Sequence, residues 1–217
     1  MSKYKLILFS RVLWLTATIV FVTGIWIAWS QQAANKSAEG STSQNINDTS
    51  NEPSTDKPDR SEFDAYQVAP DAPRYIFISK LAAEAIVKPM GLTAQNQIEA
   101  PVNVFHAGWY TKSAKPGHTG AMVVDGHVSS RHTQGIFSGL KDLKGGDSII
   151  IVRGDNQKIN YKVVKSQVYD ADRVDMTAVL KPVNPQKSGL NLITCAGTVI
   201  KGTHQFDKRI VVFAEQM

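Results

Sequence analysis

The chain contains very little cysteine: among its 217 residues there is one, Cys195. A single cysteine excludes a framework of disulfides within the chain. It also excludes structural zinc and iron–sulfur sites, which need several cysteine ligands. A lone cysteine is most often a small buried apolar residue, and it becomes a candidate nucleophile when a base and a cation lie beside it. The role of Cys195 therefore depends on which residues the fold brings to it.

The sequence also lacks any concentrated patch of charge. Its net charge is +5, and after the N-terminus there is no dense Lys/Arg stripe of the kind that binds nucleic acid. The aspartates are scattered, and His127 and His132 have the spacing of a zinc pair without a third ligand nearby. We therefore predict no nucleic-acid partner, no metal site and no other cofactor.

One long run without any charged residue extends from Val12 to Trp29. It approaches the length of about 20 residues that crosses a bilayer as a helix. Lysine and arginine residues precede it within residues 1–11, which predicts a cytoplasmic N-terminus and a single-pass cell-membrane anchor with the rest of the chain outside. A cleaved signal peptide is the alternative. However, the run is longer than a typical signal-peptide core, and the SQQAANKSA segment after it is a weak cleavage site.

The remainder of the chain divides by composition into two parts. Residues 30–72 are rich in Ser, Thr, Asn, Gln, Asp and Pro, which predicts a flexible extracellular spacer. Residues 73–217 contain many short β-prone runs separated by turn signals, which favours a closed all-β barrel. Short helices are expected within residues 79–91, 135–143 and 176–182, the first with a serine as its N-cap.

Three residues that can cooperate in acyl transfer stand at or beside strand ends. His127 follows VVDG, Cys195 follows LIT, and Arg209 precedes IVVFA. Cysteine and histidine can act as a nucleophile and its proton-transfer partner. A guanidinium is permanently charged and can stabilise the oxyanion that forms when a thiolate attacks a peptide carbonyl.

The choice of arginine depends on strand geometry. Period-two alternation puts Arg209 on the same face as Val211 and Phe213, where a charged residue needs a reason such as an active-site groove. Arg131, on the loop after the histidine, and Arg153, before a hairpin turn, are the competing candidates. We predict that Arg209 is the catalytic arginine.

These motifs, in this order and behind an N-terminal anchor, resemble those of sortases, which are membrane-anchored cysteine transpeptidases. LITC at 192–195 resembles the motif that carries the nucleophile, and VVDGHV at 123–128 resembles the segment that carries the histidine. KRIVVFA at 208–214 resembles the last strand, which brings the arginine. The segment GWYTKSAKPGHTGAMVVDGHV at 108–128 is most similar to class F or class E sortases. The resemblance covers about residues 73–214.

The resemblance implies an eight-stranded sortase-type β-barrel domain over residues 73–217, with Cys195, His127 and Arg209 as its catalytic residues. It implies cleavage of a Leu-Pro-x-Thr-Gly-like sorting signal between Thr and Gly, through a thioester on Cys195. The implied acceptor is an amine of a peptidoglycan precursor or a lysine of a pilin-like protein.

Two further residues are weaker candidates for substrate contact: Thr194, beside the candidate nucleophile, and His204, in the loop between Cys195 and Arg209. Two other functions stay open. A thiol peptidase would use the same residues and release the acyl group to water. A membrane-tethered β-barrel binding module would need no catalysis, and loss of Cys195 would leave its ligand binding intact.

Overall fold

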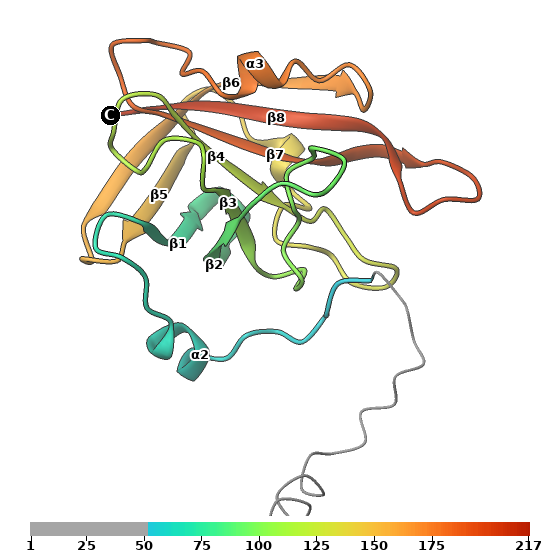
Figure 1. Cartoon of the computed structure of the whole chain (residues 1–217), viewed down its shortest axis with the longest axis horizontal. Coiled ribbons are helices and arrows are strands. Elements are labelled where there is room, and N and C mark those ends of the chain that lie inside the picture. The colour runs from blue at the N-terminus through green and yellow to red at the C-terminus, as the bar shows by residue number, and fades with distance from the viewer. Residues whose placement is uncertain (1–51) are drawn as a thin grey trace, which may run out of the picture. The chain divides into compact units, whose positions relative to one another are not determined.

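The computed structural model describes residues 52–217, and eight strands in that range close into one barrel (Figure 1). The strands are β1 (Pro73–Ile78), β2 (Ala83–Met90), β3 (Ala107–Tyr110), β4 (Ala121–Gly126), β5 (Ser148–Arg153), β6 (Lys158–Asp170), β7 (Gly189–Val199) and β8 (Phe206–Gln216). The short helical elements are α2 (Arg60–Ala65), α3 (Met176–Val179) and two single 3-10 turns, η1 (Ser79–Leu81) and η2 (Leu140–Asp142). The predicted all-β closed barrel with short helices is confirmed.

The predicted membrane helix, Val12–Trp29, lies outside the described residues. So do the predicted cytoplasmic residues 1–11 and the first part of the predicted spacer. Within residues 52–217, no helix combines the length and the apolar character that a bilayer crossing needs.

The strand order around the barrel brings together segments that are far apart in the sequence. The order is β1-β2-β3-β4-β7-β8-β6-β5, and pairing of β1 with β5 closes the barrel. The β2–β3 and β4–β7 pairs are parallel, and the other pairs are antiparallel. The strands β4, β7 and β8 are therefore neighbours. These are the strands that carry or precede the predicted histidine, cysteine and arginine.

Side chains on β7 and β8 alternate between the two sides of the barrel wall. Leu192 and Val212 belong to the main core, which fills the barrel. A second apolar cluster lies on the other side of the wall and consists of Val123, Val179 of α3, Ile193, Val211 and Phe213. We call this second group the outer cluster. The outer cluster makes part of the outer side of β7 and β8 a buried apolar surface. Polar residues farther along the same side of these strands lie next to this surface.

The helix predicted within residues 79–91 is wrong. After the single turn of η1, Ala82 adopts the left-handed conformation with φ of 48°, and the chain continues as strand β2. This strand pairs on both sides, with Ile86 opposite Tyr75 of β1 on one of them. The backbone hydrogen bonds of a strand that is paired on both sides outweigh the helix propensity of an alanine-rich sequence. The helix expected within residues 135–143 is reduced to η2.

The described part of the predicted spacer contacts the barrel rather than extending away from it. Phe63 of α2 is buried, and its ring centroid lies 5.5 Å from that of Tyr75 in β1. The hydroxyl of Tyr66 donates to the carbonyl oxygen of Val87 in β2 over 2.8 Å. These aromatic residues interrupt the polar composition that predicts a spacer, and they supply the contacts that hold residues 52–72 on the barrel.

Candidate active site

Cys195 and Arg209 lie directly opposite each other in the antiparallel pair of β7 and β8. Cys195 follows Ile193 by two residues, and Arg209 precedes Val211 by two, so both side chains lie on the side of the wall that holds the outer cluster. Directly opposed residues have their Cβ atoms about 4.5–5.5 Å apart. The nucleophile and the cation proposed from the sequence therefore form a cross-strand pair.

His127 directly follows a strand, β4, whose last residue is tied to β7 by a buried hydrogen bond. It follows the last residue of β4, which runs parallel to β7. At the end of this pairing, the hydroxyl of Thr194 donates to the carbonyl oxygen of Gly126 over 2.6 Å. The next residues in each segment are Cys195 and His127. The bond therefore ties the end of β4, which leads to the candidate base, to the interior of β7, which carries the candidate nucleophile.

The ring and the backbone of His127 are both fixed by neighbours. Its Nε2 atom lies 2.7 Å from the carbonyl oxygen of Pro101, in the segment before β3. The loop after His127 returns to it, because the backbone N–H of Phe137 donates to the His127 carbonyl over 3.0 Å. Gly135 lies so close that a Cβ atom there would be 2.2 Å from the same carbonyl oxygen. A larger residue at this position would displace the histidine.

The thiol of Cys195 is half-buried, and its surroundings favour the protonated form. Burial raises the pKa of Cys195 above its ordinary value, the positive charge of Arg209 opposes this effect, and the carboxyl of Asp125 adds to it. The attacking form of a cysteine is the thiolate. The free site therefore needs a group that removes the thiol proton when substrate is bound.

Asp125 is a further ionisable group on the same face and was not among the residues predicted from the sequence. It lies two residues after Val123 of the outer cluster, and its partner in the β4–β7 register is Ile193. Burial raises the pKa of Asp125 to about 7, while a hydrogen bond with the backbone of Gly126 and the charge of Arg209 oppose the increase. The candidate site thus contains two half-buried acids, Cys195 and Asp125, whose pKa values are both lowered by one guanidinium.

The guanidinium of Arg209 is bound to the protein along one edge. Its Nη1 atom donates to the carbonyl oxygens of Phe206 (3.1 Å) and Lys208 (2.9 Å). The competing arginine, Arg131, is instead engaged at both its backbone and its side chain with Glu52, and the Nε to Oε2 distance is 2.8 Å. The geometry therefore favours Arg209 over Arg131 as the partner of the thiol.

The two weaker candidates lie in different surroundings. Thr194 is 1% exposed on the core side of β7, and its hydroxyl is used in the bond to Gly126, so it orients the strand ends from inside. His204 is exposed in the turn between β7 and β8, beyond the point where Val199 pairs with Phe206. Figure 1 shows this hairpin projecting beyond the other strands. Neither placement gives a contact with Cys195.

The sequence contained a signal for Asp125 but none for Pro101. Met122 and Val124 alternate into the main core, so the same period-two pattern places Asp125 on the outer side, as for the candidate arginine. Pro101 contributes a main-chain oxygen. Every residue has such an oxygen, so residue types and spacing cannot identify the one that binds the histidine.

The comparisons of this chain with known proteins identify one family. The family model described as Sortase domain matches residues 76–217. No curated protein matches the sequence. The match to the family model covers all eight strands except the first residues of β1, together with Cys195, His127 and Arg209.

Several solved sortase structures are similar to this chain. Sortase A from Corynebacterium diphtheriae matches with a TM-score of 0.51 and 24% identity, over 69% of this chain and 62% of that one. The pilus-related sortase C of Group B Streptococcus matches with a TM-score of 0.51 and 18% identity, over 69% of each chain. The Pilus Island 1 sortase C2 of Group B Streptococcus matches with a TM-score of 0.51 and 18% identity, over 76% of this chain and 82% of that one. At these identities the likeness is one of fold.

Proposed function

Because the chain belongs to the sortase family, we propose that it is a cysteine transpeptidase that moves a peptide acyl group from a sorting signal to an amine. One observation supports this proposal most strongly. Cys195 faces Arg209 across β7 and β8, and the adjacent Thr194–Gly126 bond fastens the strand end that carries His127. This arrangement supports a site that combines a nucleophile, a permanent cation and a proton-transfer group.

The proposed reaction has two acyl-transfer steps. The Cys195 sulfur attacks the threonine carbonyl carbon of a Leu-Pro-x-Thr-Gly-like signal, while His127 takes up the thiol proton. The C–N bond to glycine breaks, and His127 gives that proton to the departing amine, which leaves a thioester. An acceptor amine from a peptidoglycan precursor or a pilin lysine then attacks the thioester carbonyl. An amide forms, and the sulfur leaves and recovers a proton.

Arg209 supports both steps without exchanging a proton. Each attack places negative charge on the carbonyl oxygen, and a guanidinium offers fixed, forked N–H donors to such a charge. The same charge lowers the pKa of Cys195 relative to what burial alone would give. The proposed site requires no metal or other cofactor.

The test is incubation of the protein with a Leu-Pro-x-Thr-Gly peptide and an amine such as triglycine, with products identified by mass spectrometry. The wild-type protein is expected to form the ligated peptide and a thioester adduct on Cys195. Cys195→Ala is expected to fold and to form neither. Ligation by Cys195→Ala would reject the proposal, and release of the free threonine acid without ligation would identify a thiol peptidase.

We further propose that Val12–Trp29 anchors the enzyme in the cell membrane and that the barrel works outside the cell. The uncharged run and the positive residues before it support this orientation. Protease added to intact cells is expected to remove the barrel and to spare the N-terminus. Assignment to class F or class E rests on residues 108–128 and stays a prediction.

A further inference from the structure

The contact of His127 with Pro101 determines which ring nitrogen exchanges protons. A backbone carbonyl oxygen can accept a hydrogen bond but cannot donate one, so at 2.7 Å the Nε2 atom of His127 must carry its hydrogen. A neutral imidazole has one protonated and one unprotonated nitrogen. The Pro101 carbonyl therefore selects the tautomer in which Nδ1 is the unprotonated nitrogen, which is the form a proton acceptor needs.

The position of the Pro101 carbonyl is set by a segment far from it in the sequence. The backbone N–H of Ser54 donates to the carbonyl oxygen of Val102 (2.7 Å), and the N–H of Val104 donates to the Ser54 carbonyl (2.9 Å). This two-bond bridge crosses the residues immediately after Pro101. The carbonyl that binds His127 thus belongs to a segment whose path is fixed by the N-terminal part of the described chain.

Asn103 connects the same two segments from its side chain. It is 9% exposed, its Nδ2 donates to the carbonyl oxygen of Asp56 (2.8 Å), and its Oδ1 accepts from the backbone N–H of Phe105 (2.8 Å). One amide group therefore both shapes the turn before β3 and binds it to residues 52–56. A buried amide with its donor and acceptor both used fixes its neighbours firmly.

A second connection reaches the loop that follows His127. Glu52 accepts from the backbone N–H of Arg131 (3.0 Å), and its Oε2 lies 2.8 Å from the Nε atom of the same arginine. The arginine side chain is 59% exposed, so this ion pair contributes little free energy. It does place residues 52–56 in contact with both segments that flank His127.

We infer that residues 52–56 form a strap that positions His127, by holding the Pro101 carbonyl against Nε2 so that Nδ1 is the atom that receives the proton of the Cys195 thiol. The inference rests on the proposed function for the identity of the base and the nucleophile. The strap residues are positioning residues, because they act on the reaction only through His127. The N-terminal segment is thereby part of the active-site structure.

The first test reads the tautomer directly and needs no activity. The full chain is labelled with 15N-histidine, and ring nitrogen and carbon-bound proton shifts are correlated at about pH 9, above the pKa of an ordinary histidine. The signal of His127 is identified by its absence in His127→Gln. We expect the Nε2–H tautomer. Observation of the Nδ1–H tautomer, or of an equal mixture, would overturn the inference.

The second test breaks the strap with a matched pair of substitutions. Ser54→Pro removes the N–H that binds Val102, whereas Ser54→Ala keeps both backbone bonds. We expect Ser54→Pro to lower kcat roughly 10- to 100-fold with little change in KM, because a small displacement of a catalytic group has effects of this size. The tautomer signal is expected to shift toward a mixture. Ser54→Ala is expected to match the wild type in both measurements.

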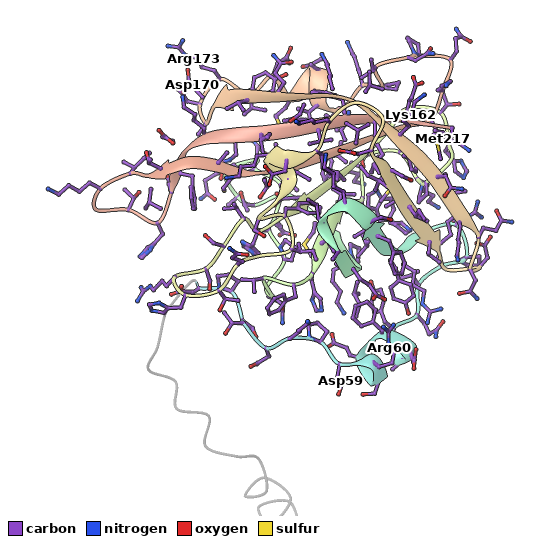
Figure 2. All side chains as sticks on the ribbon, turned by 180° about the vertical axis from the view of Figure 1, so that it is seen from behind. Asp59, Arg60, Lys162, Asp170, Arg173 and Met217 are labelled. Atoms are coloured by element: carbon purple, nitrogen blue, oxygen red, sulfur yellow. The ribbon has the colours of Figure 1, made fainter. Side chains whose placement is uncertain are left out.

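Asn103→Asp provides an independent break, since it keeps the acceptor for Phe105 and loses the donor to Asp56. Arg60→Gln is the control for a general change in the N-terminal segment. It removes the ion pair between α2 and Glu84. Figure 2 shows Arg60 on the opposite side of the domain from Asp170, the last residue of β6. Thermal unfolding confirms that each variant is folded. Unchanged kcat and tautomer in both strap variants would reject the inference.

The transpeptidase mechanism and the strap can be rejected by different results. If Cys195→Ala still ligates peptides, the proposed transpeptidase mechanism fails, but the tautomer of His127 is unaffected by that result. If the wild type ligates peptides and His127 carries its hydrogen on Nδ1, the mechanism stands and the strap inference fails.

Discussion

One edge of the Arg209 guanidinium is hydrogen-bonded to the protein, and the other edge can donate to a substrate. Within residues 52–217, its hydrogen bonds run from Nη1 to the carbonyls of Phe206 and Lys208. These bonds orient the planar group, so that Nε and Nη2 can donate together to a developing oxyanion. The positive charge of Arg209 and its paired N–H donation to the oxyanion are therefore separable roles. The first can be measured by the reactivity of the Cys195 thiol and the second by the rate of peptide ligation.

Arg209→Lys should keep the charge and lose the fork. We expect kcat/KM for peptide ligation to fall about 10²–10³-fold, the usual effect of removing one oxyanion donor. The rate at which iodoacetamide alkylates Cys195 should change little, because the positive charge that lowers the pKa of the thiol is retained. Arg209→Ala should lower both rates. Arg131→Ala, which removes the partner of Glu52, should leave alkylation unchanged, and a complete loss of ligation in that variant alone would mean that Arg131 is the catalytic arginine.

Asp125 couples the ionisation of the site to the stability of the fold. Its pKa is about 7 in the folded protein against an ordinary value of 3.8, so the folded state holds the proton more tightly than the unfolded state does. The stabilisation is fully present below about pH 4 and is lost as the pH rises through 7. At about 1.4 kcal/mol per pKa unit, the loss is at most about 4 kcal/mol.

Asp125→Asn should remove this loss. We expect the difference in unfolding free energy between Asp125→Asn and the wild type to shift in favour of the variant as the pH rises from 4 to 8, measured by urea denaturation. The variant also loses a charge that raises the pKa of Cys195, so iodoacetamide should react faster with its thiol at pH 7.5. Asp142→Asn, at an exposed position, is the matched control and should show neither effect. A pH-independent difference would contradict the coupling.

At the level of single residues, the sequence was informative where chemistry depends on residue type. A lone cysteine, a histidine after a strand and an arginine in the last strand were selected together, and the fold places Cys195 opposite Arg209 with His127 at the adjoining strand end. Thr194 was selected because it adjoins Cys195, and the fold directs its hydroxyl into the wall. The Pro101 carbonyl could not be selected, because its role comes from a tertiary contact of the main chain.

Among the elements, α3 depends on one buried side chain of β7. Asn191 is fully buried, and its Nδ2 donates to the carbonyl oxygens of Val179 (2.6 Å) and Lys181 (3.0 Å) at the end of α3. Val179 is part of the outer cluster that adjoins Cys195 and Arg209. A helix of a single turn has little stability of its own, so this amide holds α3 over the cluster.

Asn191→Leu should therefore loosen α3. The substitution has a similar volume but leaves two carbonyl oxygens without their donor, which costs about 1–3 kcal/mol of unfolding free energy. Urea denaturation measures this change, and hydrogen exchange should show reduced protection of the Val179 and Leu180 amides. Gln186→Ala, at an exposed position in the same connection, is the control. Wild-type protection in Asn191→Leu would show that apolar packing alone holds α3.

The elements also show where strand prediction succeeds. The short β-prone runs expected within residues 73–217 include the segments that form β5 to β8. The segment of β2 was predicted as a helix because alanine and a serine cap are local signals for a helix. Its pairing with β1 on one side and β3 on the other is a long-range effect, which a local pattern does not contain.

For the whole molecule, composition and contacts give different boundaries for the folded domain. The polar composition of residues 30–72 predicts a domain that begins at residue 73. In the structure, residues 52–72 cover Tyr75 with Phe63 and pair with the segment around Asn103. A few aromatic and backbone contacts suffice to dock a polar segment, and an average over forty residues conceals them. The average composition of a segment therefore does not by itself locate the edge of a folded domain.

Arg74 makes this boundary testable, because it is 9% exposed and depends on the segment before it. Its Nε and Nη2 donate to the carbonyl oxygens of Tyr66 (2.7 Å) and Asp64 (3.2 Å), and its Nη1 donates to Asn156 (3.1 Å). A chain that begins at residue 73 loses the first two acceptors and also loses Phe63. The loss of two of the three hydrogen bonds of a guanidinium is destabilising, and so is the loss of a buried phenylalanine.

We expect a chain of residues 73–217 to have an unfolding free energy at least about 3 kcal/mol lower than a chain of residues 52–217, measured by urea denaturation. Arg74→Met distinguishes the cause. In the longer chain it removes hydrogen bonds to Tyr66, Asp64 and Asn156 and should destabilise, whereas in the shorter chain only the bond to Asn156 is left to lose, so the destabilisation should be smaller. A smaller effect of Arg74→Met in the shorter chain would establish residues 52–72 as part of the fold. Equal stability of the two chains would place the boundary at residue 73, as composition alone predicts.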